Sequence, residues 1–86
     1  MEAAGREIEQ AAAAIRDYLL ARPDAADTAE GIAHWWVLPV TGEKDLDVVM
    51  EALALLERRG EVEPWQLGRR FLYRAGPALR ADGASA

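Results

Sequence analysis

A chain of 86 residues can form one compact domain, because a second hydrophobic core would have no residues left to fill it. Its composition, 51% hydrophobic and 29% charged, is typical of a globular protein, and the lack of cysteine excludes disulfides and thiolate metal sites. With a single histidine we expect no metal and no other cofactor, and a net charge of −5 argues against nonspecific binding to polyanions.

The charge is divided unevenly along the chain. Residues 1–57 hold 12 acidic and 4 basic residues, a net charge of −8, whereas residues 58–86 hold 3 acidic and 6 basic residues, a net charge of +3. No stretch reaches the roughly 20 apolar residues that cross a bilayer, and the acidic start lacks the basic region of a signal peptide. We therefore expect a cytoplasmic protein that does not bind membranes.

The first two predicted elements are helices. Between residues 5 and 22, apolar side chains recur every three or four positions around an alanine-rich middle, and Pro23 ends this helix. A second helix is predicted over residues 28–37, capped by Asp27 or Thr28, with Glu30 returning the bond in a variant of the capping box. The residues expected to stop this second helix are Pro39 and Gly42.

A third helix is predicted from residue 44 to the glycine at position 60. Five apolar residues recur there with helical spacing and are expected to face the core: Leu46, Val49, Met50, Leu53 and Leu56. Two arginines followed by Gly60 suit the end of this helix, because cations and a left-handed glycine both stabilise a helix C-terminus.

After Gly60 the hydrophobic period changes to that of strands. Residues 61–65 and 70–74 alternate in character around a turn, which predicts a β-hairpin. Pro64 has no N–H to donate, so its strand should place that position at a sheet edge or a bulge. The tail over residues 77–86, rich in alanine, glycine and serine, is expected to be disordered, which leaves residues 1–76 as the domain.

Three helices followed by a two-stranded hairpin predict an α+β fold of the winged helix-turn-helix type. The segments ALALLERRGEV (residues 52–62) and GRRFLYRA (residues 68–75) resemble the helix end and second wing strand of ArsR-type and MarR-type repressors. The resemblance covers residues 28–75 and implies a winged-helix fold. The cysteine motif of the ArsR-type metal sensors is absent, so their metal response does not carry over.

DNA reading, the usual function of such repressors, is not expected from the third helix. Its positions off the apolar stripe include Asp47 and Glu51, whose negative charges would repel the phosphates of DNA. None of these positions holds an arginine or asparagine, the residues that usually contact bases. We therefore interpret the exposed side of this helix as a protein interface. The candidate residues are Val48, Glu51, Ala52 and Leu55, together with Trp65 of the hairpin and Trp35 of the second helix.

Two of these candidates have competing interpretations. A slightly rotated third helix would bury Leu55 in the domain's own core instead of exposing it. Trp35 and Trp36 are about 100° apart on a helix, so one of them is expected near the surface, although both could fill a groove between the first two helices.

The arginines give the chain a second candidate partner. Arg58, Arg69, Arg70 and Arg74, near Trp65, could hold a hairpin wing on a phosphate backbone. The competing interpretation is that Arg58 caps the third helix together with Arg59, while the hairpin arginines pair with Glu61 and Glu63.

Nothing in the sequence favours an enzyme. There is no cysteine or glycine-rich phosphate loop, the only serine lies in the tail, and Asp47 and Glu51 are expected to be solvated. The sequence predicts a small non-catalytic interaction module, either a protein-binding adaptor or a regulator that associates with itself as a dimer. The alternative is a DNA-binding transcriptional regulator that uses the arginine-rich wing.

Overall fold

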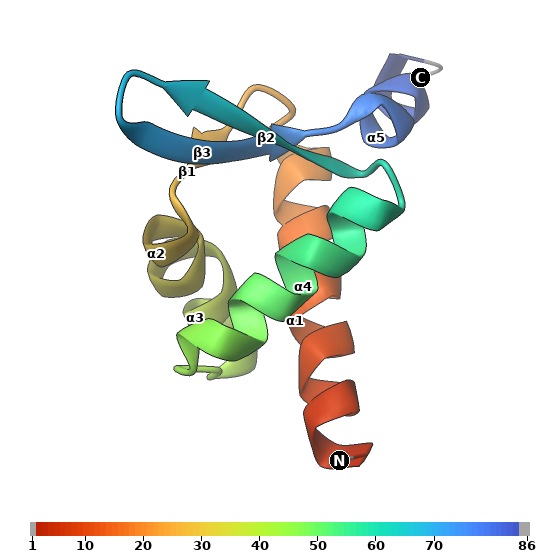
Figure 1. The fold of residues 1–86 in the computed structure, drawn as a ribbon. Helices are drawn as coiled ribbons and strands as arrows, with labels where there is room; N and C mark the ends of the chain where they lie inside the picture. Colours follow the sequence, from red (N-terminus) through yellow and green to blue (C-terminus); the bar gives the residue numbers. More distant parts are fainter. Residues whose placement is uncertain (1, 85–86) are drawn as a thin grey trace.

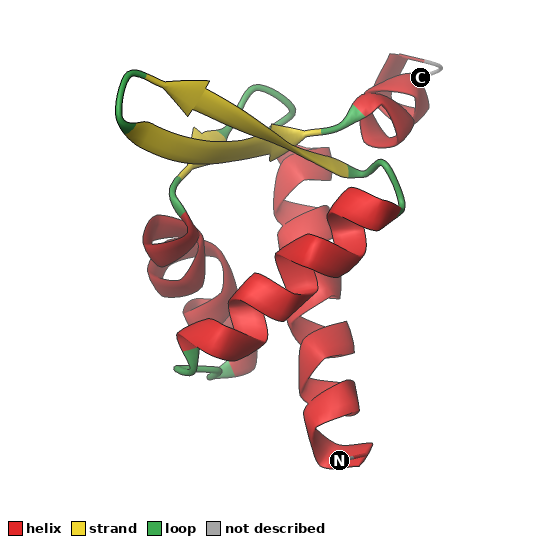
Figure 2. Cartoon of the chain, in the orientation of Figure 1, coloured by secondary structure: helices red, strands yellow, loops and turns green. Residues whose placement is uncertain are grey.

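A computed structural model of the chain describes the backbone of residues 2–84 and the side chains of residues 5–80. The larger helices lie on one side of a small antiparallel sheet (Figures 1 and 2). In chain order the elements are α1 (Glu2–Ala21), β1 (Ala26–Asp27), α2 (Ala29–Gly31), η1 (Ile32–Val37), α3 (Leu38–Thr41), α4 (Leu46–Arg58), β2 (Val62–Leu67), β3 (Arg70–Ala75) and α5 (Pro77–Ala84).

The first helix, α1, follows the predicted apolar spacing. Its buried residues are small or branched and include Ala11, Ala12, Ile15 and Leu19, and it ends just before Pro23. The alanines let α4 lie close along α1, because short side chains permit close approach of two helices. The first predicted helix is confirmed.

The second helical segment is longer than predicted and has a π-helical turn in its middle. Thr28 caps it by accepting the N–H of Gly31 at 3.1 Å, and Glu30 makes no return bond within the described residues. The prediction that Pro39 ends this helix is wrong, since α3 runs on to Thr41 and stops at Gly42, which has φ 78°. Pro39 is tolerated because it lies in the first turn of α3, directly after the wider π-turn, where a missing N–H costs little.

The third predicted helix is α4; its C-terminus is formed by the predicted glycine, and its N-terminus by a cap that the sequence analysis did not name. The Asp45 side chain accepts the N–H of Asp47 at 2.9 Å, and at the other end Gly60 has φ 74° while the N–H of Glu61 bonds the Leu56 carbonyl. The helix is rotated relative to the prediction: Met50 is 46% exposed, whereas Ala52 is fully buried. Ala52 belongs to the same buried cluster as the alanines of α1, where a methionine would not fit between close helices.

The sheet has three strands where two were predicted. Its order is β1-β3-β2, and β1 pairs with β3 through Ala26 opposite Arg74 and Asp27 opposite Tyr73. A strand of two residues has no measurable period, so the sequence does not predict it. The strand β2 is an edge of the sheet and leaves Pro64 exposed, as predicted.

The hairpin turn consists of Gly68 and Arg69. Gly68 has φ 64° and no other residue type in the described chain has positive φ, a pattern typical of a type II′ turn.

The prediction of a disordered tail is wrong for residues 77–84, which form α5, while residues 85 and 86 lie outside the described part of the chain. Leu79 of α5 is only 3% exposed and joins the core, and the N–H of Ala78 bonds the carbonyl of Gly60 at 2.9 Å. The domain therefore includes α5 and does not end at residue 76.

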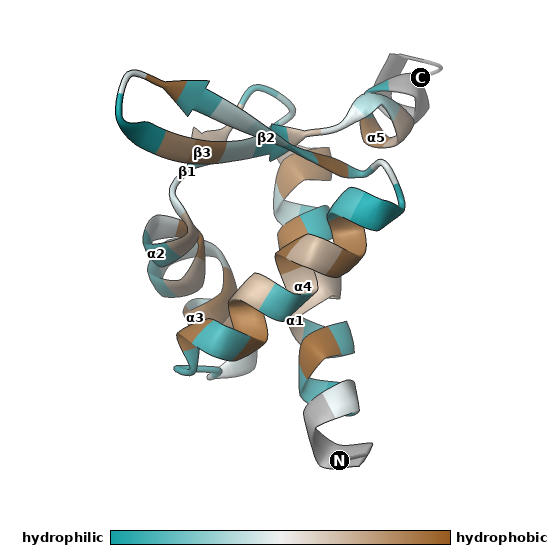
Figure 3. Cartoon of the chain, viewed as in Figure 1, coloured by the Kyte–Doolittle hydropathy of each residue, from teal (hydrophilic) through white to brown (hydrophobic). Residues whose placement is uncertain are grey.

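The core lies where α1, α4, η1 and the inner side of the sheet meet. Figure 3 shows that hydrophobic residues alternate with hydrophilic ones along α1, α4 and the strands. Trp36 lies in this core and stacks on Tyr18 of α1, with ring centroids 4.2 Å apart and planes inclined by 10°. The stack fixes η1 against α1 and so positions α4.

Candidate functional site

The outer face of α4 differs from the interface predicted from the sequence. Ala52 is fully buried and cannot contact a partner, which corrects its place among the candidates. Val48 and Leu55 are half-buried and pack against the core, so the rotated-helix interpretation is confirmed for Leu55. Of the predicted residues on α4, Glu51 alone is exposed.

The residues of α4 that are exposed to solvent are Asp47, Met50, Glu51, Glu57 and Arg58. We call Asp47, Met50 and Glu51, with the capping residue Asp45, the acidic face of α4. Carboxylates are stabilised in the first turn of a helix by its dipole and would repel a phosphate backbone. This face combines negative charge with an exposed methionine, a flexible apolar side chain that adapts to a protein surface.

The hairpin places its residues on two sides by the register of its strands. Val62 and Ala75 pair on the inner side, where both are buried, and Tyr73 packs against the core. Trp65 pairs with Leu72 on the outer side, where Trp65 is half-buried. This placement follows from alternation along the strands and keeps Trp65 away from the core.

Arg74 is occupied inside the hairpin. Its guanidinium lies 4.7 Å from the centre of the Trp65 ring and forms an ion pair of 2.8 Å with Glu63, as the pairing interpretation predicted for that glutamate. Arg80 of α5 approaches the same carboxylate at 3.5 Å. The hydrogen bond from Arg74 is the largest influence on the pKa of Glu63 and lowers it; burial opposes this, and the hydrogen bond from Arg80 with the charges of both arginines keeps the pKa below its ordinary value.

The other predicted pairing partners differ. Glu61 pairs with Arg16 of α1 at 3.2 Å and not with a hairpin arginine, because the inner end of the hairpin lies against α1. Arg59 pairs with Glu9 of α1 at 3.7 Å. Arg58, Arg69 and Arg70 are exposed and make no ion pair or hydrogen bond within the described part of the chain.

The free end of the hairpin carries exposed apolar side chains beside these unpaired arginines. Leu67, 54% exposed, comes just before the Gly68-Arg69 turn and pairs with Arg70, the first residue of β3; Phe71, 52% exposed, follows on the opposite face of the hairpin. We call Leu67, Arg69, Arg70 and Phe71 the hairpin tip; Figure 1 shows the turn projecting away from α5. Sequence reasoning missed Leu67 and Phe71, because strand alternation does not reveal where a hairpin extends beyond the helices.

The two neighbouring tryptophans of η1 are separated as one interpretation predicted. Trp36 is buried in its stack with Tyr18, whereas Trp35 is 65% exposed and meets His34 edge to face at 4.5 Å. The interpretation that both rings fill a groove is therefore wrong. Trp35 remains a candidate contact residue.

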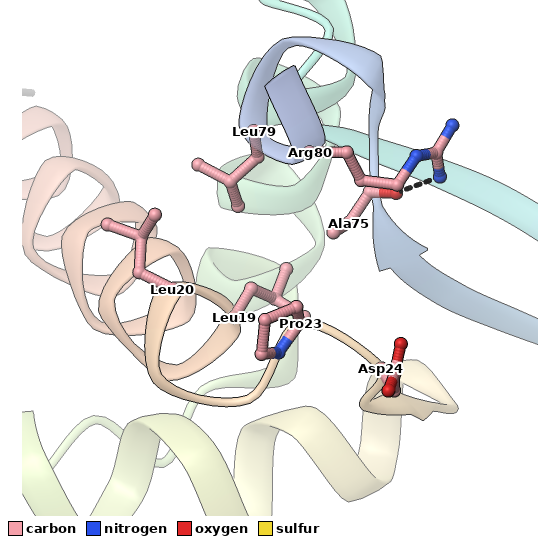
Figure 4. A pocket seen from close by; sticks show the side chains of 7 residues that line it. All are labelled: Leu19, Leu20, Pro23, Asp24, Ala75, Leu79 and Arg80. Atoms are coloured by element: carbon pink, nitrogen blue, oxygen red, sulfur yellow. Dashed lines mark hydrogen bonds between the residues drawn. The ribbon is translucent and has the colours of Figure 1, made fainter. Parts of the chain in front are cut away.

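Two clefts border the helices. One lies between the end of α1 and α5, has a volume of about 310 Å³ and is lined mainly by apolar residues, with Leu20 and Leu79 facing it (Figure 4). The other, also about 310 Å³, lies between η1 and the start of α4 and has Glu30 and Glu43 among its lining residues. Among the described side chains, those of residues 5–80, no group of three is suited to a metal ion, and no helix of the described backbone is long and apolar enough to cross a membrane.

Together these features define an α+β protein in which helices cover one side of a three-stranded antiparallel sheet and a hairpin extends beside an acidic helix. Comparison with protein-family models, characterised proteins and solved structures finds no match.

Proposed function

We propose that this chain is a non-catalytic winged helix-turn-helix module that binds protein through the acidic face of α4 and the adjoining hairpin. The order of elements supports the fold: the helical segment 29–41 and α4 are joined by four residues that include Gly42, and a hairpin follows α4 directly. In this arrangement α4 occupies the position of a recognition helix.

The observation that carries the proposal is the exposed pair Asp47 and Glu51, one helical turn apart, with the exposed Met50 beside it. A helix that enters a major groove needs cations and amide side chains at these positions, and two carboxylates there would repel phosphates. An exposed apolar side chain among acids suits a protein surface with basic and apolar groups.

DNA binding is the second candidate function, favoured by Arg69 and Arg70. Both arginines are exposed and unpaired in the described part of the chain, so both are available to phosphates. Two phosphate contacts from a wing, opposed by the charge of α4 and a net charge of −5, supply little affinity. We therefore place protein binding first.

Titration of labelled duplex DNA, followed by fluorescence anisotropy at about 50 mM salt, where phosphate contacts are strong, separates the two functions. We expect no saturable binding. Binding that is abolished by the double substitution Arg69→Glu and Arg70→Glu would overturn the protein-binding proposal in favour of a DNA-binding regulator.

Capture of protein by the immobilised domain tests the site itself. We expect the double substitution Asp47→Lys and Glu51→Lys to abolish capture that the native chain shows. A matched control, Glu7→Lys with Asp17→Lys, makes the same charge change on exposed residues of α1 and should leave capture intact. Equal loss in both variants would show that net charge, and not the acidic face of α4, governs binding.

A further inference from the structure

The hairpin tip carries two arginines that the fold itself does not pair. Residues 64–73 contain no acid, and Arg69 and Arg70 make no ion pair within the described residues. Leu67 and Phe71 beside them are each more than half exposed. Exposed aromatic and aliphatic side chains next to arginine are the composition enriched at the centre of protein interfaces.

The acidic face of α4 has the complementary chemistry. Two exposed carboxylates, Asp47 and Glu51, lie one helical turn apart with the exposed Met50 beside them, so this face offers an apolar contact next to two anions. The hairpin tip offers apolar contacts beside two cations. Opposite charges around apolar side chains are the arrangement that gives an interface its register and its specificity.

The two surfaces do not meet within one chain. The tip residues and the residues of the acidic face are all exposed, and no ion pair joins them in the described structure. Each copy of the chain therefore presents both halves of a complementary pair. A second copy of the chain therefore carries a hairpin tip that is complementary in charge to the acidic face of α4.

We propose that the partner of this module is a second copy of the chain, with the hairpin tip of one copy docked on the acidic face of α4 in the other. The inference rests on the proposed function, because it uses the same surface. Two copies can exchange both contacts at once and form a closed dimer. A hairpin end set against a few turns of helix buries a small area, so the association is weak and depends on concentration.

A charge exchange between the two surfaces tests this contact. The tip variant carries Arg69→Glu with Arg70→Glu, and the face variant carries Asp47→Lys with Glu51→Lys. Each variant alone sets like charges against each other, and we expect its dissociation constant to rise about tenfold or more above that of the native chain. An equimolar mixture of the two variants again sets opposite charges together and should recover the native value.

Sedimentation equilibrium measures these constants over about 10 to 500 µM protein, the range in which small interfaces associate. The Glu7→Lys, Asp17→Lys variant is the control and should associate like the native chain. A further variant, Leu67→Ser with Phe71→Ser, removes the apolar contact without changing charge and should also weaken association. Circular dichroism first verifies that each variant is folded.

Three results would overturn the second-copy contact: a native chain that stays monomeric over this range, charge variants that associate as tightly as the native chain, or a mixture that fails to recover association. None of these results contradicts the proposed function, which fails if DNA binds through the arginines, if the face variant captures protein normally, or if the face variant and the α1 control lose capture equally. The two proposals can therefore fail separately.

Discussion

Individual residues of this fold are fixed by contacts that helix propensity does not show. Gly31 lies inside a helix, where alanine normally adds about 1 kcal/mol of stability. A Cβ at this position would overlap the carboxylate of Asp27, which holds the Thr28 N–H at 2.7 Å just ahead of the helix. The glycine is therefore required by its neighbour and not by its own backbone angle.

We expect Gly31→Ala to destabilise the chain by about 1 to 2 kcal/mol, because the short Asp27 side chain must give up its bond to make room. Urea unfolding measures the effect. The same substitution in a chain that already carries Asp27→Ala should cost less, since the obstructing carboxylate is gone. A Gly31→Ala protein more stable than the native chain would show that Asp27 moves aside freely.

Among the elements, the helices with long apolar repeats were predictable and the short elements were not. The bounds of α1 and α4 follow from period and capping, because a stripe of four or more apolar residues outweighs other local preferences. The strand β1 and the helix α5 depend on contacts with β3 and with the core, which leave no pattern in the sequence. Their formation is a tertiary effect.

The candidate site was predicted in kind but not in detail. The acids of α4 were identified correctly as exposed, since Asp47 and Glu51 lie off every apolar stripe the helix could use. The exposure of Met50 and the burial of Ala52 could not be predicted, because they depend on how closely α1 approaches α4. Rotating a helix by part of a turn moves a methionine from core to surface without changing its period.

The anchor of α5 can be tested at the scale of the element. Leu79 and Leu20 line the same cleft, but Leu79 is buried while Leu20 is 41% exposed (Figure 4). We expect Leu79→Ala to cost about 2 to 4 kcal/mol of unfolding free energy, and Leu20→Ala less than about 1 kcal/mol. Thermal unfolding followed by circular dichroism compares them. Equal small losses would mean that α5 contributes nothing to the core.

At the scale of the whole molecule, contacts between distant segments join the two ends of the chain. The ion pair from Arg16 to Glu61 spans 45 positions, and β1 pairs with a strand that begins more than 40 residues later. Glu63 of β2 adds a further contact between segments, because its carboxylate forms ion pairs with both Arg74 of β3 and Arg80 of α5. Three consecutive C-terminal elements therefore meet at one carboxylate.

This junction makes the stability of the chain depend on acid pH. Because Arg74 and then Arg80 lower the pKa of Glu63 in the folded chain, its contribution is complete above the pKa of the unfolded chain, about 4.3, and is lost as the pH falls through the lower folded value. Glu63→Gln should therefore be less stable than the native chain at pH 7, and the difference should shrink below about pH 4. Thermal unfolding across this range measures it, with Glu57→Gln, an exposed glutamate of α4, as the matched control. A difference that stays constant from neutral to acid pH would mean that the carboxylate is not stabilised by its two arginines.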